Sequence, residues 1–174
     1  MKKVRVWDLG IRLFHWSVVV IILANFTIFE EGAGHEILGY TLLGLLGLRF
    51  IWGFIGSRHA RFSDFMPTPG KIHRHLKEIS DGEILIYTGH NPLGALMIFN
   101  LYFTLLLLGL TGWLAITDRF WGVAWVEEIH EFFAGYLLFI VIFHVSGVLW
   151  ESFRSGVNLI SAIFTGIKKM PRRR

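Results

Sequence analysis

The sequence predicts an all-α integral membrane protein built as a four-helix bundle. The chain of 174 residues is 53% hydrophobic and has a mean hydropathy of +0.54, which is too apolar for a soluble domain of this length. Its apolar residues gather in four stretches, each close to the roughly 20 residues that a bilayer requires. Open strands cannot satisfy their backbone hydrogen bonds in lipid, so we expect all four stretches to be helices.

The order of the stretches predicts one membrane domain over residues 1–174. The candidate spans cover residues at about 11–29, 36–56, 93–116 and 132–150. The connection from Glu30 to Gly34 is very short, which makes the first two helices antiparallel neighbours. A long polar loop runs from about Ser57 to Asn91, and we expect a short surface helix over Lys71 to Ile79 within it. The first apolar run lacks a small-residue cleavage site, so we interpret it as a retained span.

The distribution of charge predicts the topology. Of the 17 Lys and Arg residues, all but Arg119 flank the same ends of the predicted spans. The positive-inside rule then places both termini and the long loop in the cytoplasm. The outer loops are acidic, and their carboxylates come from Glu30, Glu31, Glu36, Asp118, Glu127, Glu128 and Glu131.

A last apolar segment follows the fourth span. Its apolar residues recur near helical spacing, at Val157, Ile160, Ile163, Phe164 and Ile167. We expect a C-terminal amphipathic helix that lies in the inner interface, followed by a basic tail near anionic headgroups. A solvated tail that acts only as a topology signal explains the charges equally well.

Four histidines lie in or beside the apolar stretches, where an ionisable group is costly and usually functional. His130 and His144 are 14 residues apart, which places them within roughly 40° of one helix face and about 21 Å apart along the axis. Depth in the bundle then pairs His35 with His130 near the outer face, and His15 with His144 near the inner face. Cysteine is absent, so histidine must carry any metal chemistry. Bis-histidine pairs at two depths predict two b-type haems, with these four imidazoles as the axial iron ligands.

Other residues are candidates for contact with the haems. Gly39 lies one turn after His35, where a missing side chain lets a flat macrocycle approach the backbone, although such glycines also serve plain helix packing. Arg12, Arg49 and Arg58 are placed to pair with haem propionates at the inner rim, and snorkelling to headgroups is the alternative for each. The long loop contains His59, His73, His75 and His90. We expect these histidines to be solvated or structural, with a metal or proton site as the alternative for His73 and His75.

Several segments resemble the bacterial cytochrome b561 family, which also contains the membrane cytochrome b subunit of nickel-iron hydrogenases. They are Arg12 to Trp16, His35 to Tyr40, Leu48 to Gly53, Ala60 to Phe62, Gly89 to Ala95, Leu110 to Gly112, His130 with Glu131, and His144 with Val145. The resemblance spans nearly the whole chain in order. The resemblance implies a four-helix, two-haem, quinone-linked electron carrier of the bacterial inner membrane, whose ligands match the four histidines named above.

The function that we expect is electron transfer by a di-haem b-type cytochrome. Its partners would be membrane lipid, ubiquinone or menaquinone, and a periplasmic or membrane redox protein such as a c-type cytochrome or a dehydrogenase, with no role for nucleic acid. We assign no catalytic residue, and a quinone-linked oxidoreductase activity stays open. The alternatives are a hydrogenase anchor subunit, a superoxide-to-quinone oxidase, and a haem-free proton or metal transporter. A superoxide oxidase requires a cationic outer funnel, which the acidic outer loops argue against.

Overall fold

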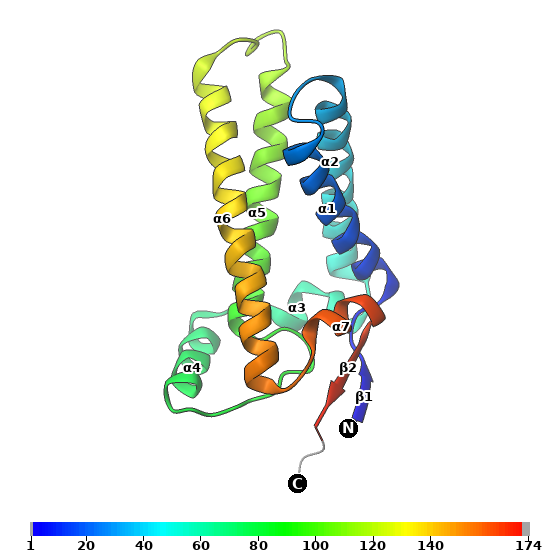
Figure 1. Ribbon diagram of the computed structural model, residues 1–174, viewed down its shortest axis with the longest axis vertical. Coiled ribbons are helices and arrows are strands. Elements are labelled where there is room, and N and C mark those ends of the chain that lie inside the picture. Colours follow the sequence, from blue (N-terminus) through cyan, green and yellow to red (C-terminus); the bar gives the residue numbers. More distant parts are fainter. Residues whose placement is uncertain (1, 172–174) are drawn as a thin grey trace.

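The computed structural model describes residues 2–171 and has four long helices that run side by side along its longest axis (Figure 1). They are α1 (Leu9–Thr27), α2 (Gly32–Ile55), α5 (Pro92–Ala115) and α6 (Ala124–Ser155). Each is long and apolar enough to cross a membrane. The predicted four-helix membrane bundle is therefore confirmed.

The fourth helix is the one that differs most from its predicted span. Helix α6 begins at Ala124, eight residues before the expected start, and has 32 residues, or about 48 Å. The acidic residues Glu127, Glu128 and Glu131 lower the hydropathy of this first part, but all three are exposed on the helix surface. A helix of this length extends beyond the roughly 30 Å hydrocarbon core of a bilayer.

The two ends of the bundle differ in charge. Both ends of the described chain lie at one end, together with the segments between α2 and α5 (Figure 1). We call it the basic end because it carries most of the Lys and Arg residues. The connections at residues 28–31 and 116–123 lie at the other end, which we call the acidic end. At the basic end, the chain forms a 3-10 turn η1 (Arg58–Ala60), α3 (Phe62–Phe65) and α4 (Pro69–Ser80). Helix α4 matches the expected surface helix.

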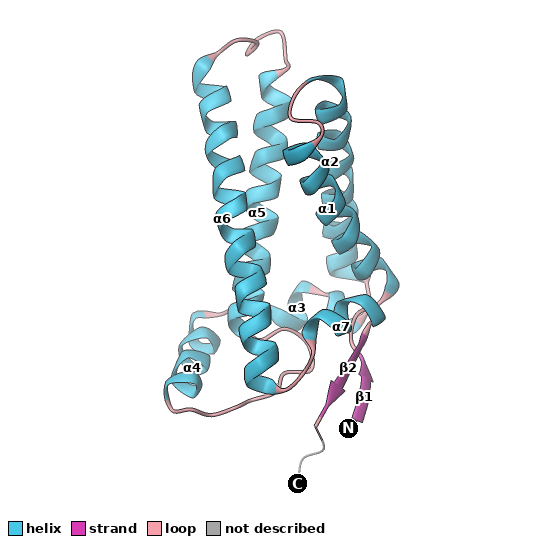
Figure 2. Cartoon of the chain, viewed as in Figure 1, coloured by secondary structure: helices cyan, strands magenta, loops and turns pink. Residues whose placement is uncertain are grey.

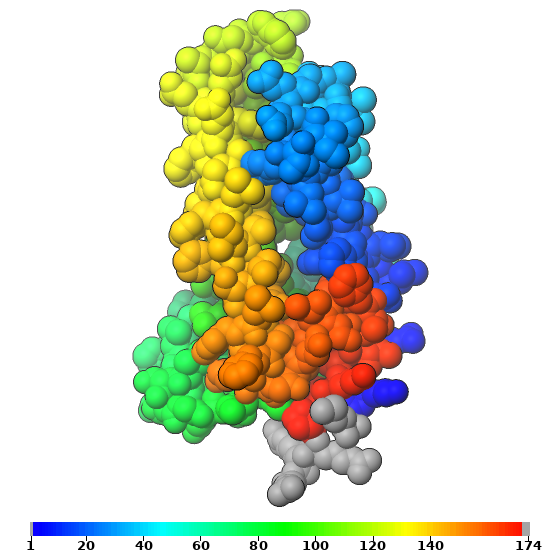
Figure 3. Space-filling view, viewed as in Figure 1, coloured from blue at the N-terminus to red at the C-terminus, as the bar shows by residue number. Residues whose placement is uncertain are grey.

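The bundle is closed on three sides only. Helix α2 packs on α1 and α5, and α5 packs on α6, whereas α1 and α6 share hardly any close backbone contacts. One apolar layer at mid-height joins all four helices; its buried members are Val18, Ile21, Leu42, Leu46, Leu105, Leu137 and Ile140. Figure 3 shows a small opening between α6 and α1.

The C-terminal segment differs from its prediction. In place of one amphipathic helix over residues 157–167, the chain forms the seven-residue helix α7 (Leu159–Thr165) and then the strand β2 (Ile167–Met170). Gly166 ends α7 in the left-handed conformation, with φ of 78°, as glycine commonly does at a helix C-terminus. Val157, expected on an interfacial face, is buried. Arg172, Arg173 and Arg174 of the expected tail lie outside the described residues.

The strand β2 pairs with the N-terminal strand β1 (Lys2–Arg5) in antiparallel register, with Lys3 opposite Lys169 (Figure 2). Beyond the sheet, the backbone N–H groups of Val6 and Trp7 both donate to the carbonyl oxygen of Gly166. Val6, Trp7 and Ala162 form a second small core under α7. The N-terminal and C-terminal segments are therefore joined at the basic end by strand pairing, backbone hydrogen bonds and apolar packing.

Candidate haem sites

The acidic end brings together the first predicted histidine pair. His35 stands in the first turn of α2 and His130 in the second turn of α6, and their ring centroids are 6.1 Å apart with the planes at 70°. Two imidazoles that bind one metal ion from opposite sides have centroids roughly 6 Å apart, since each metal–nitrogen bond is about 2 Å long. The separation of His35 and His130 therefore fits one shared iron.

Hydrogen bonds determine which ring nitrogen carries the proton in this pair. Nδ1 of His35 lies 2.9 Å from the carbonyl oxygen of Phe29. Since a carbonyl only accepts, Nδ1 must carry the proton. Nδ1 of His130 lies 3.1 Å from Oγ1 of Thr111, whose hydroxyl has carbonyl acceptors of its own on α5. Both rings thus use Nδ1 for hydrogen bonding and leave Nε2 free for a metal, which is the usual arrangement of histidine ligands.

The second predicted pair lies below the apolar layer, near the basic end. His15 of α1 and His144 of α6 are both partly buried, and they are close enough that a charge on one would act on the other. The His15 ring also meets the Trp16 ring edge-on, with centroids 5.0 Å apart. Helices α1 and α6 have hardly any close backbone contacts with each other. The space between these two helices therefore separates His15 from His144.

Several buried polar atoms at the basic end have no hydrogen-bond partner. They are Nε of Arg12, Nδ1 of His15, Nε1 of Trp16, Nη1 of Arg49 and Nδ1 of His90. Folded proteins satisfy nearly all buried polar atoms, so such a concentration indicates a missing group that supplies acceptors. Haem propionates are carboxylates, which guanidinium groups bind well. The residues present therefore fit haem at this end.

The three candidate arginines have different surroundings. Arg49 is only 7% exposed. It donates from Nη2 to the carbonyl oxygen of Ala60 at 3.0 Å and lies 4.8 Å from the ring centroid of Phe62. Arg49 thus does not snorkel to headgroups. Arg58 has an 85% exposed side chain that pairs with Asp64 at 3.6 Å, so it does not face the histidine pair. Arg12 is partly buried.

The candidate glycine Gly39 faces open space, because a Cβ atom added there would meet nothing within 4 Å. The same holds for Gly135 and Gly147 on α6. This leaves room for a flat ring system and equally for lipid. Gly112 differs, because it lies directly against His130. Sequence reasoning missed Thr111 and Gly112 as site residues, although both stand in a segment that resembles the family.

The donor set suits a metal that brings its own macrocycle. Among residues 2–171, no group of three or more His, Cys, Asp or Glu side chains is placed to hold a metal ion. Two imidazoles alone supply too few ligands for a free metal ion. Haem iron, by contrast, needs only its axial ligands from the protein.

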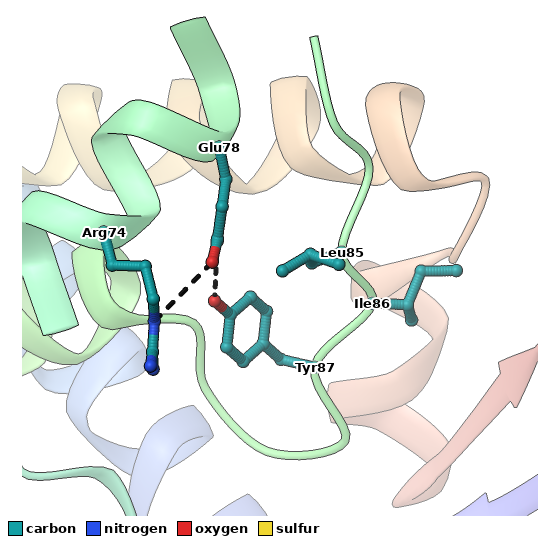
Figure 4. A pocket seen from close by; sticks show the side chains of 5 residues that line it. All are labelled: Arg74, Glu78, Leu85, Ile86 and Tyr87. Carbon is teal, nitrogen blue, oxygen red and sulfur yellow. Dashed lines mark hydrogen bonds and ion pairs between the residues drawn. The ribbon is translucent and has the colours of Figure 1, made fainter. Parts of the chain in front are cut away.

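The loop histidines are mostly structural. His75 is 1% exposed and lies 3.1 Å from Glu78, and Glu78 also accepts from the Tyr87 hydroxyl at 3.0 Å. Figure 4 shows Tyr87 and Arg74 converging on Glu78 at a pocket of about 390 Å³. His73, by contrast, is exposed on α4. The two therefore share no metal site.

His90 packs against two rings at the basic end, Trp7 at 4.5 Å and Phe65 at 4.7 Å between centroids. Burial, followed by the nearby charges of Lys168 and Arg49, lowers the pKa of His90 to about 3. Its imidazole is therefore neutral at physiological pH and adds no charge to the site.

Four spanning helices that carry paired histidines are the features of a membrane-bound b-type cytochrome. Residues 6–166 match the family described as prokaryotic cytochrome b561, and the chain belongs to that family. It is therefore an integral membrane protein that binds b-type haem and acts in electron transfer.

Two curated relatives of the chain are named as b-type cytochrome subunits. The chain is 24% identical to a "Probable Ni/Fe-hydrogenase B-type cytochrome subunit" of Rhizobium leguminosarum bv. viciae, over 95% of this chain and 88% of the relative. It is 25% identical to a protein of the same name from Azotobacter vinelandii, over 94% of this chain and 87% of the relative. No solved structure matches the chain.

Proposed function

We propose that the chain is a di-haem cytochrome that carries electrons across the bacterial inner membrane between a redox partner and the quinone pool, which is ubiquinone or menaquinone. One observation carries the proposal: two histidine pairs lie on opposite sides of the apolar layer that joins the four helices. Each haem supplies one-electron redox chemistry when bound.

Each residue has a defined part in this proposal. His35 and His130 would hold the iron at the acidic end, and His15 and His144 would hold the iron at the basic end. Each pair of imidazoles would supply the iron ligands from the protein, and the haem would supply the redox chemistry. Arg12 and Arg49 bind propionates at the basic end, Gly39 leaves room for the macrocycle, and the apolar layer keeps water from connecting the two sites.

The charge asymmetry supports an orientation with the basic end and both termini in the cytoplasm. The acidic end then faces the periplasm and exposes Glu36, Glu127, Glu128 and Glu131. Such a surface attracts a partner with a basic face. The names of the two relatives favour a hydrogenase as that partner. We further propose that residues 1–174 form one domain, since β1 and β2 join its two ends.

The haem content of the purified full-length chain tests the proposal. A pyridine haemochrome assay is expected to give two b haems per chain, with the sharp reduced bands of low-spin bis-histidine haem. Alanine substitutions at His35 or His130 should remove one haem, and substitutions at His15 or His144 should remove the other. His73→Ala, on the exposed face of α4, is the matched control and should keep both.

Other haem contents would contradict specific parts of the proposal. One haem in the native chain would disprove the second site. Two haems lost in other groupings would disprove the pairing by depth. A chain without a Soret band would favour the haem-free transporter.

A further inference from the structure

The two histidine pairs differ in what their Nδ1 atoms contact. At the acidic end, Nδ1 of His35 and of His130 each has an acceptor, the carbonyl oxygen of Phe29 and the hydroxyl of Thr111. At the basic end, Nδ1 of His15 is buried and has no partner. His15 therefore lacks the support from the protein that both ligands at the acidic end receive.

The direction of the Thr111 hydrogen bond follows from its neighbours. Oγ1 of Thr111 lies 2.9 Å from the carbonyl oxygen of Leu107 and 3.1 Å from that of Leu108. Both carbonyls only accept, so the single hydroxyl proton points to them. The oxygen lone pairs are left to accept from Nδ1 of His130. A histidine that donates from Nδ1 is a more basic ligand through Nε2.

Ligand basicity bears on the reduction potential. A more basic imidazole stabilises the ferric iron, which carries the extra positive charge, over the ferrous iron. The carboxylates of Glu36 and Glu131, each next to a ligand histidine in sequence and exposed, favour the same oxidation state by Coulomb attraction. Both effects lower the potential of the site at the acidic end.

The surroundings of the other pair act in the opposite direction. Arg49 is 7% exposed and Lys168 is 5% exposed, and both act on the charge of His90, which in turn is near His144. Within residues 2–171, neither cation has an acidic side chain within 4 Å, and the carboxylates that act on them, Asp8 on Arg49 and Glu151 on Lys168, lie farther away. Buried positive charge favours the reduced form of a haem, which carries one more electron. The reduction potential at the basic end is therefore raised.

We infer that Thr111 is a positioning residue that, together with the carbonyl of Phe29, sets the acidic-end haem at a lower reduction potential than the basic-end haem. With both haems bound, this order of potentials would favour electron transfer from the acidic end to the basic end, which is inward in the proposed orientation. This inference rests on the proposed di-haem function, and it adds the direction of transfer and the residue that helps to set it.

A spectroelectrochemical redox titration of the purified holoprotein tests the inference. The His35→Ala and His15→Ala variants, which each keep one haem, assign the two midpoints. The native chain should give the lower midpoint for the haem held by His35 and His130. Thr111→Val keeps the shape of the side chain but removes the acceptor. It should raise that midpoint alone, by up to about 59 mV, which is a tenfold change in the ratio of oxidised to reduced haem.

Two further variants separate this role from packing. Thr111→Ser restores the hydroxyl and should return the midpoint to the native value. Thr41→Val removes an exposed hydroxyl on α2 that bonds only to the carbonyl of Ile37, and should change neither midpoint. Loss of the acidic-end haem in Thr111→Val but not in Thr111→Ser also supports the inference, since valine fills the same space.

Three results would overturn the inference. They are a higher midpoint at the acidic end, an unchanged midpoint in Thr111→Val, and equal shifts of both haems in that variant. A chain with one haem or none would instead contradict the proposed function, and the haem count reports this before any titration.

Discussion

A Cβ atom on Gly112 would lie 3.0 Å from Cε1 of His130 and 3.4 Å from its Nδ1. The absent side chain therefore lets the imidazole lie directly against α5, within reach of the Thr111 hydroxyl. One turn of α5 thus provides both the space for this ligand and its hydrogen-bond acceptor. The haem that we place at the acidic end depends on this contact between α5 and α6.

Gly112→Val is expected to displace the His130 ring and to weaken haem retention at the acidic end by at least about tenfold. Disturbing the support of a metal ligand typically costs 10–100-fold in affinity. The measurement is haem per chain after extended washing, with the remaining haem assigned by its midpoint. Gly47→Val on α2 is the matched control, because its Cβ would meet nothing within 4 Å. Full retention in Gly112→Val would show that the contact has no role.

Arg49→Gln is expected to weaken haem retention at the basic end by about tenfold and to lower the midpoint of that haem. The substitution removes a buried positive charge whose Nη1 has no protein partner. Redox titration of the variant measures the midpoint, and washing measures retention. Arg58→Gln is the control, since the side chain of Arg58 is 85% exposed beside Asp64. Equal effects of the two substitutions would show that Arg49 is not part of the haem site.

Sequence reasoning could predict the features that depend on composition and helical periodicity. The four spans follow from the lengths of the apolar runs. The pairing of histidines by depth follows from the antiparallel order of the spans and from helix rise alone. Because His130 and His144 stand on one helix, their separation along the axis needs no knowledge of tertiary packing.

The remaining features depend on contacts that no local pattern specifies. That α5 turns Thr111 and Gly112 toward His130 depends on how α5 and α6 pack. The pairing of β1 with β2 joins residues from the two ends of the chain, and their lysines predict a solvated tail and not a sheet. Gly166 is a local signal for the end of α7, since a glycine after Thr165 is typical of a helix end.

Tyr87→Phe is expected to reduce the stability of the basic end by about 1 kcal/mol, the usual contribution of one hydrogen bond. The hydroxyl of Tyr87 donates to Glu78 (Figure 4). Glu78 also lies 3.1 Å from the buried His75. Burial and the Glu78 carboxylate both raise the pKa of Tyr87, so the phenol keeps the proton that it donates. Thermal unfolding should show a decrease of about 2–4 °C. His73→Ala, on the exposed face of α4, should show none, and an equal decrease there would point to a general weakness of α4.

Lys168 has an ammonium group that is held by neutral partners. Its Nζ donates to the carbonyl oxygens of Gly89 at 2.7 Å and Tyr87 at 3.2 Å, and it lies 5.5 Å from the ring centroid of Trp7. Burial lowers the pKa of Lys168 from 10.5 to about 8. The folded chain therefore binds this proton less tightly than the unfolded chain does.

This difference gives the stability of the chain a defined pH dependence. Between pH 8 and 10.5 the unfolded chain binds more protons at Lys168, whose pKa is lowered by folding, so the free energy of unfolding rises with pH across this window. The gain is up to about 3 kcal/mol. It should appear as the difference between the native chain and Lys168→Met, measured by denaturant unfolding at pH 7, 9 and 10.5. Lys169→Met, at the exposed neighbouring position of β2, should keep the native slope. Parallel profiles of the native chain and Lys168→Met would mean that burial does not shift this lysine.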